Sequence, residues 1–477
     1  MTADLLLINP CSQNQNPMMP LGLAALAAYV RDAGHSVQAL DAWAETLQSE
    51  EQVKQRLRNI PPPRVAGVSV LTPNLRGAKM IVLALREIFP DTLILIGGPH
   101  VSALPDTALD EFPEADMGVF GEGELTLSEI MSRVKSGGAL SGIEGTLWRD
   151  NGITLKGNPR GVIKDLDILP RPARDLFPID LYHSHLPYGR RWRYMNEITS
   201  RGCPFKCAYC SKSVYGNSYR AFSPARVIED LRELTVRYQV REIHFYDDDL
   251  TLNRKRTVEL LERLIEAKLD LIWSCTTRCD LVDYELLLLM KKAGCWMVSY
   301  GVESGNDILR ETINKGVDRS QIETAVRDTK RAGLRVTGYL MIGLPGETEE
   351  TVRETIEFAD ALDPDYVNWA VMTVYPGSPF YFDLKAGKYG LGRLVEDEAG
   401  GGDSPFQDSF LIGFEGALTR QRMYELARQA TRHFYLRPGK MLRILRDIRS
   451  AGQIKQLAKT GWQTLSWLLS PPADQRG

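Results

Sequence analysis

The sequence predicts an α/β protein with a doubly wound parallel sheet, then a partial (β/α)6 barrel and a small helical C-terminal region. Three observations support this prediction. Short apolar runs alternate with helical patterns in the first quarter of the chain, prolines then interrupt the pattern, and a second alternating series starts near Glu197. Strands that alternate with helices form parallel sheets covered on both faces. A chain of 477 residues is also too long for one ordinary domain.

The first series indicates a Rossmann-like domain over residues 1–140. Its clearest predicted helices are Leu21–Ala33 and Leu75–Phe89, and its predicted strands are Leu5–Asn9, His35–Leu40, Val65–Leu71, Leu93–Ile96 and Met117–Phe120. Ligands of such sheets bind outside the carboxyl ends of the strands. The loops expected to bind a ligand are therefore residues 10–20, 72–74, 97–100 and 121–124.

The rest of the chain divides into three parts. Residues 141–190 carry five prolines and are expected to form a linker. Residues 191–385 contain six predicted strands of an open TIM-type barrel, whose active site would lie at the carboxyl ends of the strands. These strands are Glu197–Ser200, Glu242–Tyr246, Leu271–Thr276, Met297–Val302, Arg335–Ile342 and Tyr366–Val374. Residues 386–477 should form a flexible loop around Gly400–Gly402 and then helices, the first over Thr419–Tyr435.

The composition is that of a soluble globular protein, with 43% hydrophobic and 25% charged residues. A net charge of −3 and a pI near 6.2 give no general case for nucleic-acid binding. The N-terminus lacks the basic region and cleavage site of a signal peptide, and the apolar run Leu21–Val30 is too short to span a bilayer. We therefore expect a cytoplasmic protein without a nucleic-acid partner.

Three of the seven cysteines, Cys203, Cys207 and Cys210, fall close together after a predicted strand. So few cysteines in so long a chain do not form a disulfide framework, and the tight cluster indicates a metal site. Iron–sulfur clusters require thiolates, and three rather than four leave one iron open to a small chelating ligand. Zinc is the alternative, although it normally needs a fourth Cys or His, which this loop lacks. The scattered cysteines are expected to be small buried hydrophobes: Cys11, Cys275, Cys279 and Cys295.

The C-x3-C-x2-C spacing, with Tyr209 before the last cysteine, resembles the signature of the radical S-adenosylmethionine superfamily. The resemblance implies a [4Fe–4S] cluster on Cys203, Cys207 and Cys210, with S-adenosylmethionine bound beside it. It also implies that one-electron reduction cleaves this cofactor to a 5′-deoxyadenosyl radical. The protein would supply binding, orientation and exclusion of side reactions.

Later motifs resemble the S-adenosylmethionine contacts of the same superfamily, in the same order. His244–Asp249 resembles the segment that contacts the methionine amino group, and Tyr300–Gly305 the motif that reaches the methionine carboxylate and ribose. Gly338–Glu347 loosely resembles the adenine element, with a wider spacing, and Val374–Pro379 a common sixth-strand end. The residues implied are Asp247, Asp248, Glu303, Ser304, Gly338 and Gly343. As alternatives, the aspartates cap a helix that begins near Asn253, and Glu303 forms a salt bridge at the edge of the core.

Four N-terminal segments resemble the cobalamin-binding domain fused ahead of many radical S-adenosylmethionine enzymes: Pro20–Tyr29, Ser69–Asn74, Gly97–His100 and Gly121–Glu124. The resemblance implies cobalamin contacts at Thr72, Pro73, Gly97, Gly98, His100, Gly121 and Glu122. The D-x-H-x-x-G motif, whose histidine ligates cobalt in many cobalamin enzymes, is absent from the sequence. Cobalt is therefore expected to have no histidine ligand from the protein. His100 is either a polar neighbour of the cofactor or pins its own loop, and a degenerate scaffold without cobalamin is the alternative for the whole domain.

The two-domain resemblance covers residues 1 to about 385 and implies a cobalamin-dependent methyltransferase. Its substrate would be an unactivated carbon of a small-molecule or lipid metabolite, and its electron donor a protein such as flavodoxin or ferredoxin. A cyclase or oxidoreductase without net methyl transfer is the second hypothesis. A tRNA-modifying methylthiotransferase would need further cluster cysteines or a basic RNA-binding module, and only Cys11 precedes Cys203. A cobalamin carrier or sensor would leave the cysteine triplet unexplained.

The C-terminal tail is basic and amphipathic between Arg432 and Trp467. Such a helix can lie on an anionic membrane surface, which would give a weak peripheral contact. Leu442, Leu445 and Ile448 follow i, i+3, i+6 spacing, which is enough for a narrow apolar stripe. We expect this stripe to pack onto the barrel, so that the tail is a docking helix rather than a membrane anchor.

Overall fold

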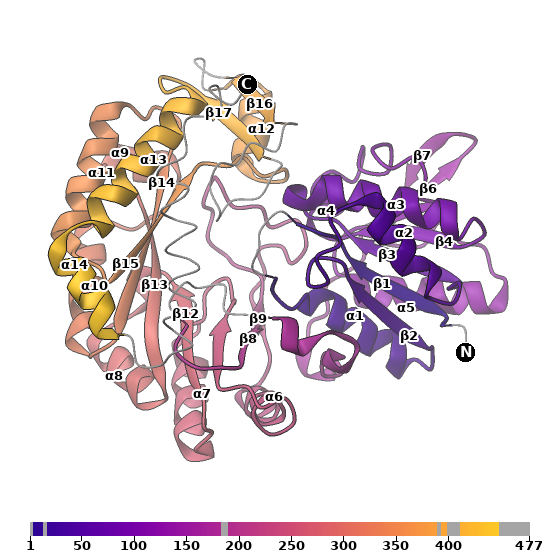
Figure 1. Ribbon diagram of the computed structural model, residues 1–477, viewed down its shortest axis with the longest axis horizontal. Helices are drawn as coiled ribbons and strands as arrows, with labels where there is room; N and C mark the ends of the chain where they lie inside the picture. The colour runs from indigo at the N-terminus through magenta and orange to yellow at the C-terminus, as the bar shows by residue number, and fades with distance from the viewer. Residues whose placement is uncertain (1–2, 13–16, 183–188, 389–392, 398–410, 448–477) are drawn as a thin grey trace.

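The computed structural model describes residues 3–12, 17–182, 189–388, 393–397 and 411–447 (Figure 1). The N-terminal part is one sheet with helices on both faces. The second part is a curled sheet with helices on its outer side, and the C-terminal helices join that outer layer (Figure 1). The predicted α/β class with two successive sheets is confirmed.

The N-terminal sheet has the strand order β2-β1-β3-β4-β5-β6-β7. Its parallel strands are β1 (Leu5–Asn9), β2 (Val37–Asp41), β3 (Val65–Ser69), β4 (Leu93–Gly97) and β5 (Met117–Val119). One face is covered by α1 (Leu21–Asp32) and α5 (Gly123–Ser136). The other is covered by α2 (Glu50–Arg58), α3 (Leu75–Ile88) and α4 (Pro99–Ala103). Burial on both faces explains why the strands are continuous apolar runs rather than alternating ones.

Two antiparallel strands, β6 (Thr146–Asp150) and β7 (Ile153–Lys156), extend this sheet beyond β5. They lie in the segment expected to be a linker, so the structure differs from that expectation here. Asn151 and Gly152 form the turn with φ values of 48° and 80°. Two left-handed residues are what a type I′ hairpin turn requires, and Asn-Gly is its strongest sequence signal.

The remainder of this segment ties the two sheets together. It contains the short 3-10 turns η2 (Leu166–Ile168), η3 (Arg174–Leu176) and η4 (Ile179–Leu181). The Tyr182 hydroxyl then donates a hydrogen bond to the buried carboxylate of Asp41, at 2.7 Å. Arg174 forms a buried ion pair with Glu197 of the second sheet.

The second sheet has six parallel strands in the order β15-β14-β13-β12-β11-β8. They are β8 (Tyr194–Glu197), β11 (Glu242–Phe245), β12 (Ile272–Thr277), β13 (Cys295–Glu303), β14 (Arg335–Ile342) and β15 (Tyr366–Val371). The outer helices are α6 (Pro224–Val236), α7 (Arg254–Ala267), α8 (Tyr284–Lys292), α10 (Arg319–Arg331) and α11 (Glu349–Leu362). Because β8 and β15 are both edge strands, the sheet is the predicted partial barrel.

The first barrel strand, β8, ends at Glu197, whereas the strand predicted from the sequence covers Glu197–Ser200. The chain leaves the sheet there because the Thr199 backbone N–H donates to the Asp247 carboxylate, at 3.1 Å, instead of to a neighbouring strand. Two short strands, β9 (Ser200–Arg201) and β10 (Arg220–Ala221), then pair with each other. The cysteine loop is the connection between them.

Helix α13 (Arg420–Tyr435) begins at its capping residue Thr419 and packs against β14 and β15, close to the predicted position. The shorter elements of this half are α9 (Asp307–Thr312), α12 (Pro379–Lys385), α14 (Pro438–Asp447) and the hairpin β16 (Arg393–Asp397) and β17 (Leu411–Glu415). No described helix has both the length and the apolar character needed to cross a membrane.

Helix α14 is held by ion pairs rather than by the expected apolar stripe. Leu442 is 55% exposed, so the predicted packing of this residue on the barrel is wrong. The Arg443 guanidinium instead donates to both Asp363 oxygens at 2.7 and 2.8 Å, and buried Lys440 lies 2.7 Å from the same carboxylate. The charged side of the helix therefore faces inward. The Leu445 side chain, Ile448 and Gly400–Gly402 lie outside the described residues.

Candidate active site

The three candidate cluster ligands lie on the loop between β9 and β10, with Cys207 buried and Cys203 and Cys210 partly buried. A hydrogen bond between the Cys207 and Cys210 thiols, with the cations Lys315 and Arg278 nearby, lowers the pKa of Cys207 and raises the pKa of Cys210. Cys207 is therefore the thiol of this pair that loses its proton first, and thiolates are the ligands that iron–sulfur clusters require. Within the described ranges no three His, Cys, Asp or Glu side chains have the geometry for a single metal ion. Three thiols on one loop are the kind of donor set that a [4Fe–4S] cluster requires.

Glu303 is the centre of a buried polar cluster beside the cysteine loop. Its carboxylate accepts hydrogen bonds from the Tyr209 hydroxyl and the Lys315 ammonium, each at 2.8 Å. Lys315 also donates to the Tyr209 oxygen, at 3.1 Å. Glu303 therefore forms a salt bridge, as the alternative hypothesis expected. This ion pair lies at the cysteine loop and not at the edge of the core. Sequence analysis missed Lys315, which no local motif marks.

Asp247 and Asp248, predicted near the methionine amino group, have different surroundings. Asp247 is buried and accepts hydrogen bonds from the Thr199 backbone and hydroxyl groups and from the Ser200 hydroxyl. It therefore holds the strand that leads into the cysteine loop. Asp248 is exposed. Of these two aspartates, Asp248 is the one whose carboxylate is open to a ligand.

The helix-cap alternative for the aspartates is wrong. Helix α7 is capped by Asn253, whose side chain accepts from the Arg256 backbone N–H at 3.1 Å. The third aspartate, Asp249, instead accepts from the Thr277 hydroxyl at 2.7 Å and so joins the ends of β11 and β12. Two of the three aspartates are thus used to fix the strand ends around the site.

Two of the predicted ribose and adenine positions lie in or next to barrel strands. Ser304 directly follows β13 and is fully buried, with its hydroxyl 3.1 Å from the Thr355 hydroxyl of α11. Gly338 lies within β14 and is paired with Tyr300 of β13. In this structure the Ser304 side chain therefore fixes the strand end against a helix.

Gly343, the other predicted adenine position, follows β14 with a φ of 102°. This positive φ favours glycine, and a Cβ at Gly343 would also displace the Met423 sulfur of α13, from which it would lie 2.6 Å. The Gly343 and Leu344 N–H groups donate to Glu347, whose other carboxylate oxygen is buried without a hydrogen-bond partner. Burial raises the pKa of Glu347 to about 7. Glu347 is therefore a buried acid at the strand end.

A cavity of about 450 Å³ lies between the N-terminal sheet and the half-barrel. Its walls come from the carboxyl ends of β1, β3, β4 and β5, from the start of α1, and from Asn196, Arg201 and Tyr246. Most of the lining side chains are apolar, and Met18 and Met19 among them belong to the predicted ligand loop of residues 10–20. This is the position expected for the ligand of a doubly wound sheet.

Four of the seven predicted cobalamin contacts line this cavity: Gly97, Gly98, Gly121 and Glu122. Gly98 has a φ of 105°, and a Cβ there would lie 3.0 Å from the Val70 carbonyl oxygen. Glycine is therefore required for the chain to turn at the cavity wall. The other three predicted contacts, Thr72, Pro73 and His100, are not among the lining residues.

His100 is buried within its own loop. Its Nδ1 atom lies 3.0 Å from the Thr72 hydroxyl, and its Nε2 atom lies 3.3 Å from a Glu111 carboxylate oxygen. With both ring nitrogens engaged in this way, the alternative that His100 pins its own loop describes the structure.

A buried network of ion pairs closes the polar end of the cavity. Arg201 donates to Glu124 at 2.6 Å, and Arg220 lies 2.8 Å from Glu122. The two glutamates lie at the start of α5 in the N-terminal domain, whereas Arg201 stands two residues before Cys203. The network therefore connects the cavity directly to the cysteine loop.

The fold and the site together define a class of enzyme. Three thiols at the strand ends of a half-barrel fit an iron–sulfur cluster, and an apolar cavity at the strand ends of a doubly wound sheet adjoins them. Comparison with protein families agrees with this assignment. Residues 198–359 match the Radical SAM superfamily, and residues 13–131 match the B12 binding domain.

Comparison with individual proteins identifies the family. The chain is 36% identical to an uncharacterized methyltransferase of Pyrococcus horikoshii, over 75% of this chain and 77% of that relative. It is 29% identical to the anaerobic magnesium-protoporphyrin IX monomethyl ester cyclase of Rubrivivax gelatinosus, over 76% of this chain and 66% of the cyclase. The radical S-adenosylmethionine methyltransferase TsrM from Kitasatospora setae has the same fold, with a TM-score of 0.74 at 18% identity over 97% of this chain and 99% of TsrM.

The chain belongs to the radical S-adenosylmethionine enzymes that carry an N-terminal cobalamin-binding domain. It is therefore an enzyme, and its cofactors are the [4Fe–4S] cluster, S-adenosylmethionine and cobalamin, as the sequence predicted.

Proposed function

We propose that this enzyme transfers a methyl group to an unactivated carbon of a small-molecule or lipid metabolite. The observation that carries the proposal is the cavity between the two domains. Its wall runs from the glycines of the cobalamin-binding domain to Arg201, two residues before the first cluster cysteine. A substrate between the cobalamin at this wall and the cysteine loop would be within reach of both cofactor sites. The relatives named as methyltransferases, from Pyrococcus horikoshii and Kitasatospora setae, support this proposal.

The barrel supplies the residues for the first two cofactors. When bound, the cluster and S-adenosylmethionine supply a 5′-deoxyadenosyl radical, and cobalamin supplies the methyl group. Cys203, Cys207 and Cys210 would hold the cluster as thiolates. Asp248 offers an exposed carboxylate for an ammonium group, which is a charge-assisted bond that a methionine moiety can make.

The N-terminal sheet supplies the cobalamin site. Gly97, Gly98 and Gly121 keep the cavity wall free of side chains, so a flat macrocycle can approach the backbone closely. Glu122 stands at the edge, where Arg220 holds its carboxylate. Because His100 is engaged by Thr72 and Glu111, we propose that cobalt is bound without a protein histidine.

The apolar lining indicates the kind of substrate and its protection. Apolar walls favour an apolar part of the substrate near the reacting carbon and exclude water from a reactive intermediate. We expect a flavodoxin or a ferredoxin as electron donor. The cytoplasmic location expected from the sequence stays a prediction.

Ring formation without net methyl transfer is the second candidate, because the Rubrivivax gelatinosus relative is named as a cyclase. The two reactions differ in their by-products. Methyl transfer forms one S-adenosylhomocysteine and one 5′-deoxyadenosine per product, since a second S-adenosylmethionine donates the methyl group. Cyclisation forms 5′-deoxyadenosine without S-adenosylhomocysteine.

The test uses the anaerobically reconstituted holoenzyme with S-adenosylmethionine that carries a deuterated methyl group. The enzyme is incubated with reductant and a metabolite extract, and both by-products and labelled metabolites are measured by mass spectrometry. A metabolite heavier by one CD3 group, with equal amounts of the two by-products, supports methyl transfer. A substrate-dependent rise in 5′-deoxyadenosine alone favours the second candidate. Cys207→Ala should abolish all products, whereas Cys279→Ala, at a buried cysteine outside the loop, should not.

A further inference from the structure

Arg278 joins the cysteine loop to the ends of the barrel strands. It directly follows β12 and is buried, with 6% of its surface exposed. Its guanidinium carbon lies 3.7 Å from the centre of the ring of Phe205, which stands between Cys203 and Cys207. A guanidinium is planar and weakly hydrated, so it stacks on an aromatic face more readily than an ammonium does. Arg278 therefore holds the loop at a residue between its first two thiols.

Bonds outside the cysteine loop fix the position of Arg278. Its guanidinium donates to both oxygens of Asp280, each at 2.9 Å, and to the Lys315 carbonyl oxygen at 2.8 Å. Its backbone N–H donates to Asp249, which follows β11, at 3.3 Å. Because a planar fork that is bonded on several sides keeps one orientation, the face that it offers to Phe205 is preorganised.

The second aromatic residue of the loop, Tyr209, is also held by a cation from outside the loop. The Lys315 ammonium lies 5.9 Å from the centre of the Tyr209 ring and 3.1 Å from its hydroxyl oxygen. Because the Lys315 carbonyl oxygen accepts from Arg278, the two cations are connected with each other. Residues 202–207 have no regular secondary structure, so the shape of this part of the loop depends on such side-chain contacts.

Arg278 also places a positive charge near the second thiol of the loop. Lys315 and Arg278 are cations that act on the Cys207 thiol, and Glu303 opposes them there. The counter-ion of Arg278 is Asp280, whose side chain is 19% exposed, whereas the Arg278 side chain is 7% exposed. Water therefore screens the carboxylate more than it screens the guanidinium, and a net positive effect of the pair remains at the loop.

We propose that Arg278 is a positioning residue of the cluster, which clamps the cysteine loop through Phe205 and stabilises the reduced cluster by its charge. Reduction adds one electron to the cluster, and nearby charges and hydrogen bonds set its reduction potential. The carboxylates of Asp248 and Asp249 act on the Cys203 thiol and disfavour the added electron, which Arg278 offsets. This role depends on the cluster that the family carries and not on the proposed methyl transfer.

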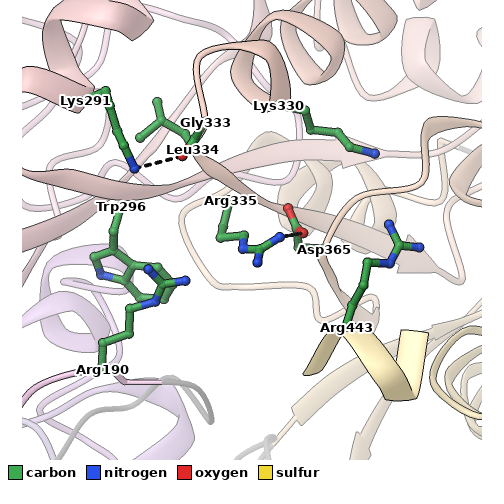
Figure 2. A pocket seen from close by; sticks show the side chains of 9 residues that line it. All are labelled: Arg190, Lys291, Trp296, Lys330, Gly333, Leu334, Arg335, Asp365 and Arg443. Atoms are coloured by element: carbon green, nitrogen blue, oxygen red, sulfur yellow. Dashed lines mark hydrogen bonds and ion pairs between the residues drawn. The ribbon is translucent and has the colours of Figure 1, made fainter. Parts of the chain in front are cut away.

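Redox titration of the anaerobically reconstituted enzyme, followed by electron paramagnetic resonance without S-adenosylmethionine, tests the effect of the charge. Arg278→Gln removes the cation, and Asp280→Asn removes its counter-ion. The matched control is Arg335→Gln, because Arg335 also pairs with an aspartate, Asp365, at 2.7 Å (Figure 2). Arg335 begins β14, whose eight residues separate it from the carboxyl end of the strand by roughly 23 Å.

Arg278→Gln should lower the equilibrium constant for cluster reduction about tenfold, which is about 59 mV for a one-electron couple. Asp280→Asn should raise this constant about threefold, because Arg278 then acts without its counter-ion. Arg335→Gln should change it by less than about twofold, since its charge is distant. If Arg278→Gln retains no cluster, the Asp280→Asn shift decides. An unchanged or lower constant in Asp280→Asn, or an equal fall in Arg278→Gln and the control, would overturn the electrostatic role.

The rate at which the cluster loses iron to a chelator tests the clamp. Arg278→Lys keeps the charge but loses the planar fork, and Phe205→Leu removes the ring. Each should speed iron loss at least about fivefold, while the constant for reduction changes by less than about twofold. The double variant should lose iron no faster than either single variant, because both changes remove the same contact. Additive effects, or iron loss at the wild-type rate in both single variants, would overturn the clamp.

Discussion

Arg201 and Glu124 form a buried ion pair, with 2.6 Å between Nη2 and Oε1, that joins the cobalamin-binding domain to the chain just before Cys203. Arg201 also lies 3.4 Å from Glu122, a cavity-lining residue. The spacing between the two cofactor sites is thus set by side chains that meet across the domain interface. The spacing between the two cofactor sites therefore does not depend on the covalent linker alone.

Removing Arg201 should therefore destabilise the whole enzyme. Arg201→Ala leaves the buried carboxylates of Glu122 and Glu124 without this partner. We expect the free energy of unfolding to fall by about 3–5 kcal/mol, as is typical when one partner of a buried ion pair is removed. Denaturant unfolding of the reconstituted enzyme measures this loss. Arg254→Ala breaks an exposed ion pair with Asp283 and should cost less than about 1 kcal/mol. A cost for Arg201→Ala as small as that of the control would contradict a structural role for the network.

The cluster should depend on all three loop cysteines. Changing Cys203, Cys207 or Cys210 to Ala removes one thiolate ligand, and the low-temperature electron paramagnetic resonance signal of the reduced cluster should disappear together with 5′-deoxyadenosine formation. Cys279→Ala serves as the control, because burial raises the pKa of this thiol to about 12 and it lies outside the loop. Full cleavage activity in a triple-alanine variant would show that these cysteines do not hold the cluster.

Cobalamin should bind without a nitrogen ligand from His100. The spectrum of the cob(II)alamin form should lack nitrogen hyperfine splitting from a histidine, and His100→Gln should retain as much corrinoid as the wild type. The reason is that Thr72 and Glu111 engage both ring nitrogens of His100. A histidine splitting in the wild type that disappears in His100→Gln would contradict this prediction.

Glu347 should make stability depend on pH. Burial raises its pKa from 4.5 to about 7, so the folded protein holds this proton more tightly than the unfolded chain. The stabilisation that comes from this tighter proton binding is therefore fully present below about pH 4.5, and it is lost as the pH rises through about 7. Glu347→Gln keeps an oxygen for the Gly343 and Leu344 N–H groups and should stabilise the protein above pH 7, by on the order of 3 kcal/mol.

Urea unfolding between pH 5 and pH 8 (a range of about three units) measures the Glu347 effect, and the gain from Glu347→Gln should shrink toward the acid end. Glu357→Gln, at an exposed position on α11, should change stability by less than about 0.5 kcal/mol. A constant difference between Glu347→Gln and the wild type across this range would show that Glu347 does not titrate as inferred.

The strands and the cysteine loop were predictable because their signals are local. Apolar runs such as Val65–Ser69 mark buried parallel strands, and three closely spaced thiols mark a metal site whatever surrounds them. The β6–β7 hairpin was not predicted, because the prolines that follow it are typical of a linker. The Asn151-Gly152 pair is nevertheless a local signal for a hairpin turn.

The partners of site residues could not be predicted, since they are brought together only by the fold. Lys315 reaches Glu303 from a loop after α9, and Met423 of α13 packs over Gly343. Leu442 illustrates the opposite error: its spacing fits an apolar stripe, but three charges on Asp363 (from Lys330, Lys440 and Arg443) hold the neighbouring segments instead. Spacing along a helix identifies a face but does not identify what that face meets.

The central claim is that one chain holds a [4Fe–4S] cluster on three thiolates and cobalamin on the adjoining sheet. Measuring iron, sulfide, zinc and corrinoid in anaerobically purified and reconstituted protein tests it most directly. We predict about four iron atoms and four sulfides per chain, with about one corrinoid retained after gel filtration. Zinc in place of iron, or a reconstituted protein that retains no corrinoid, would contradict it.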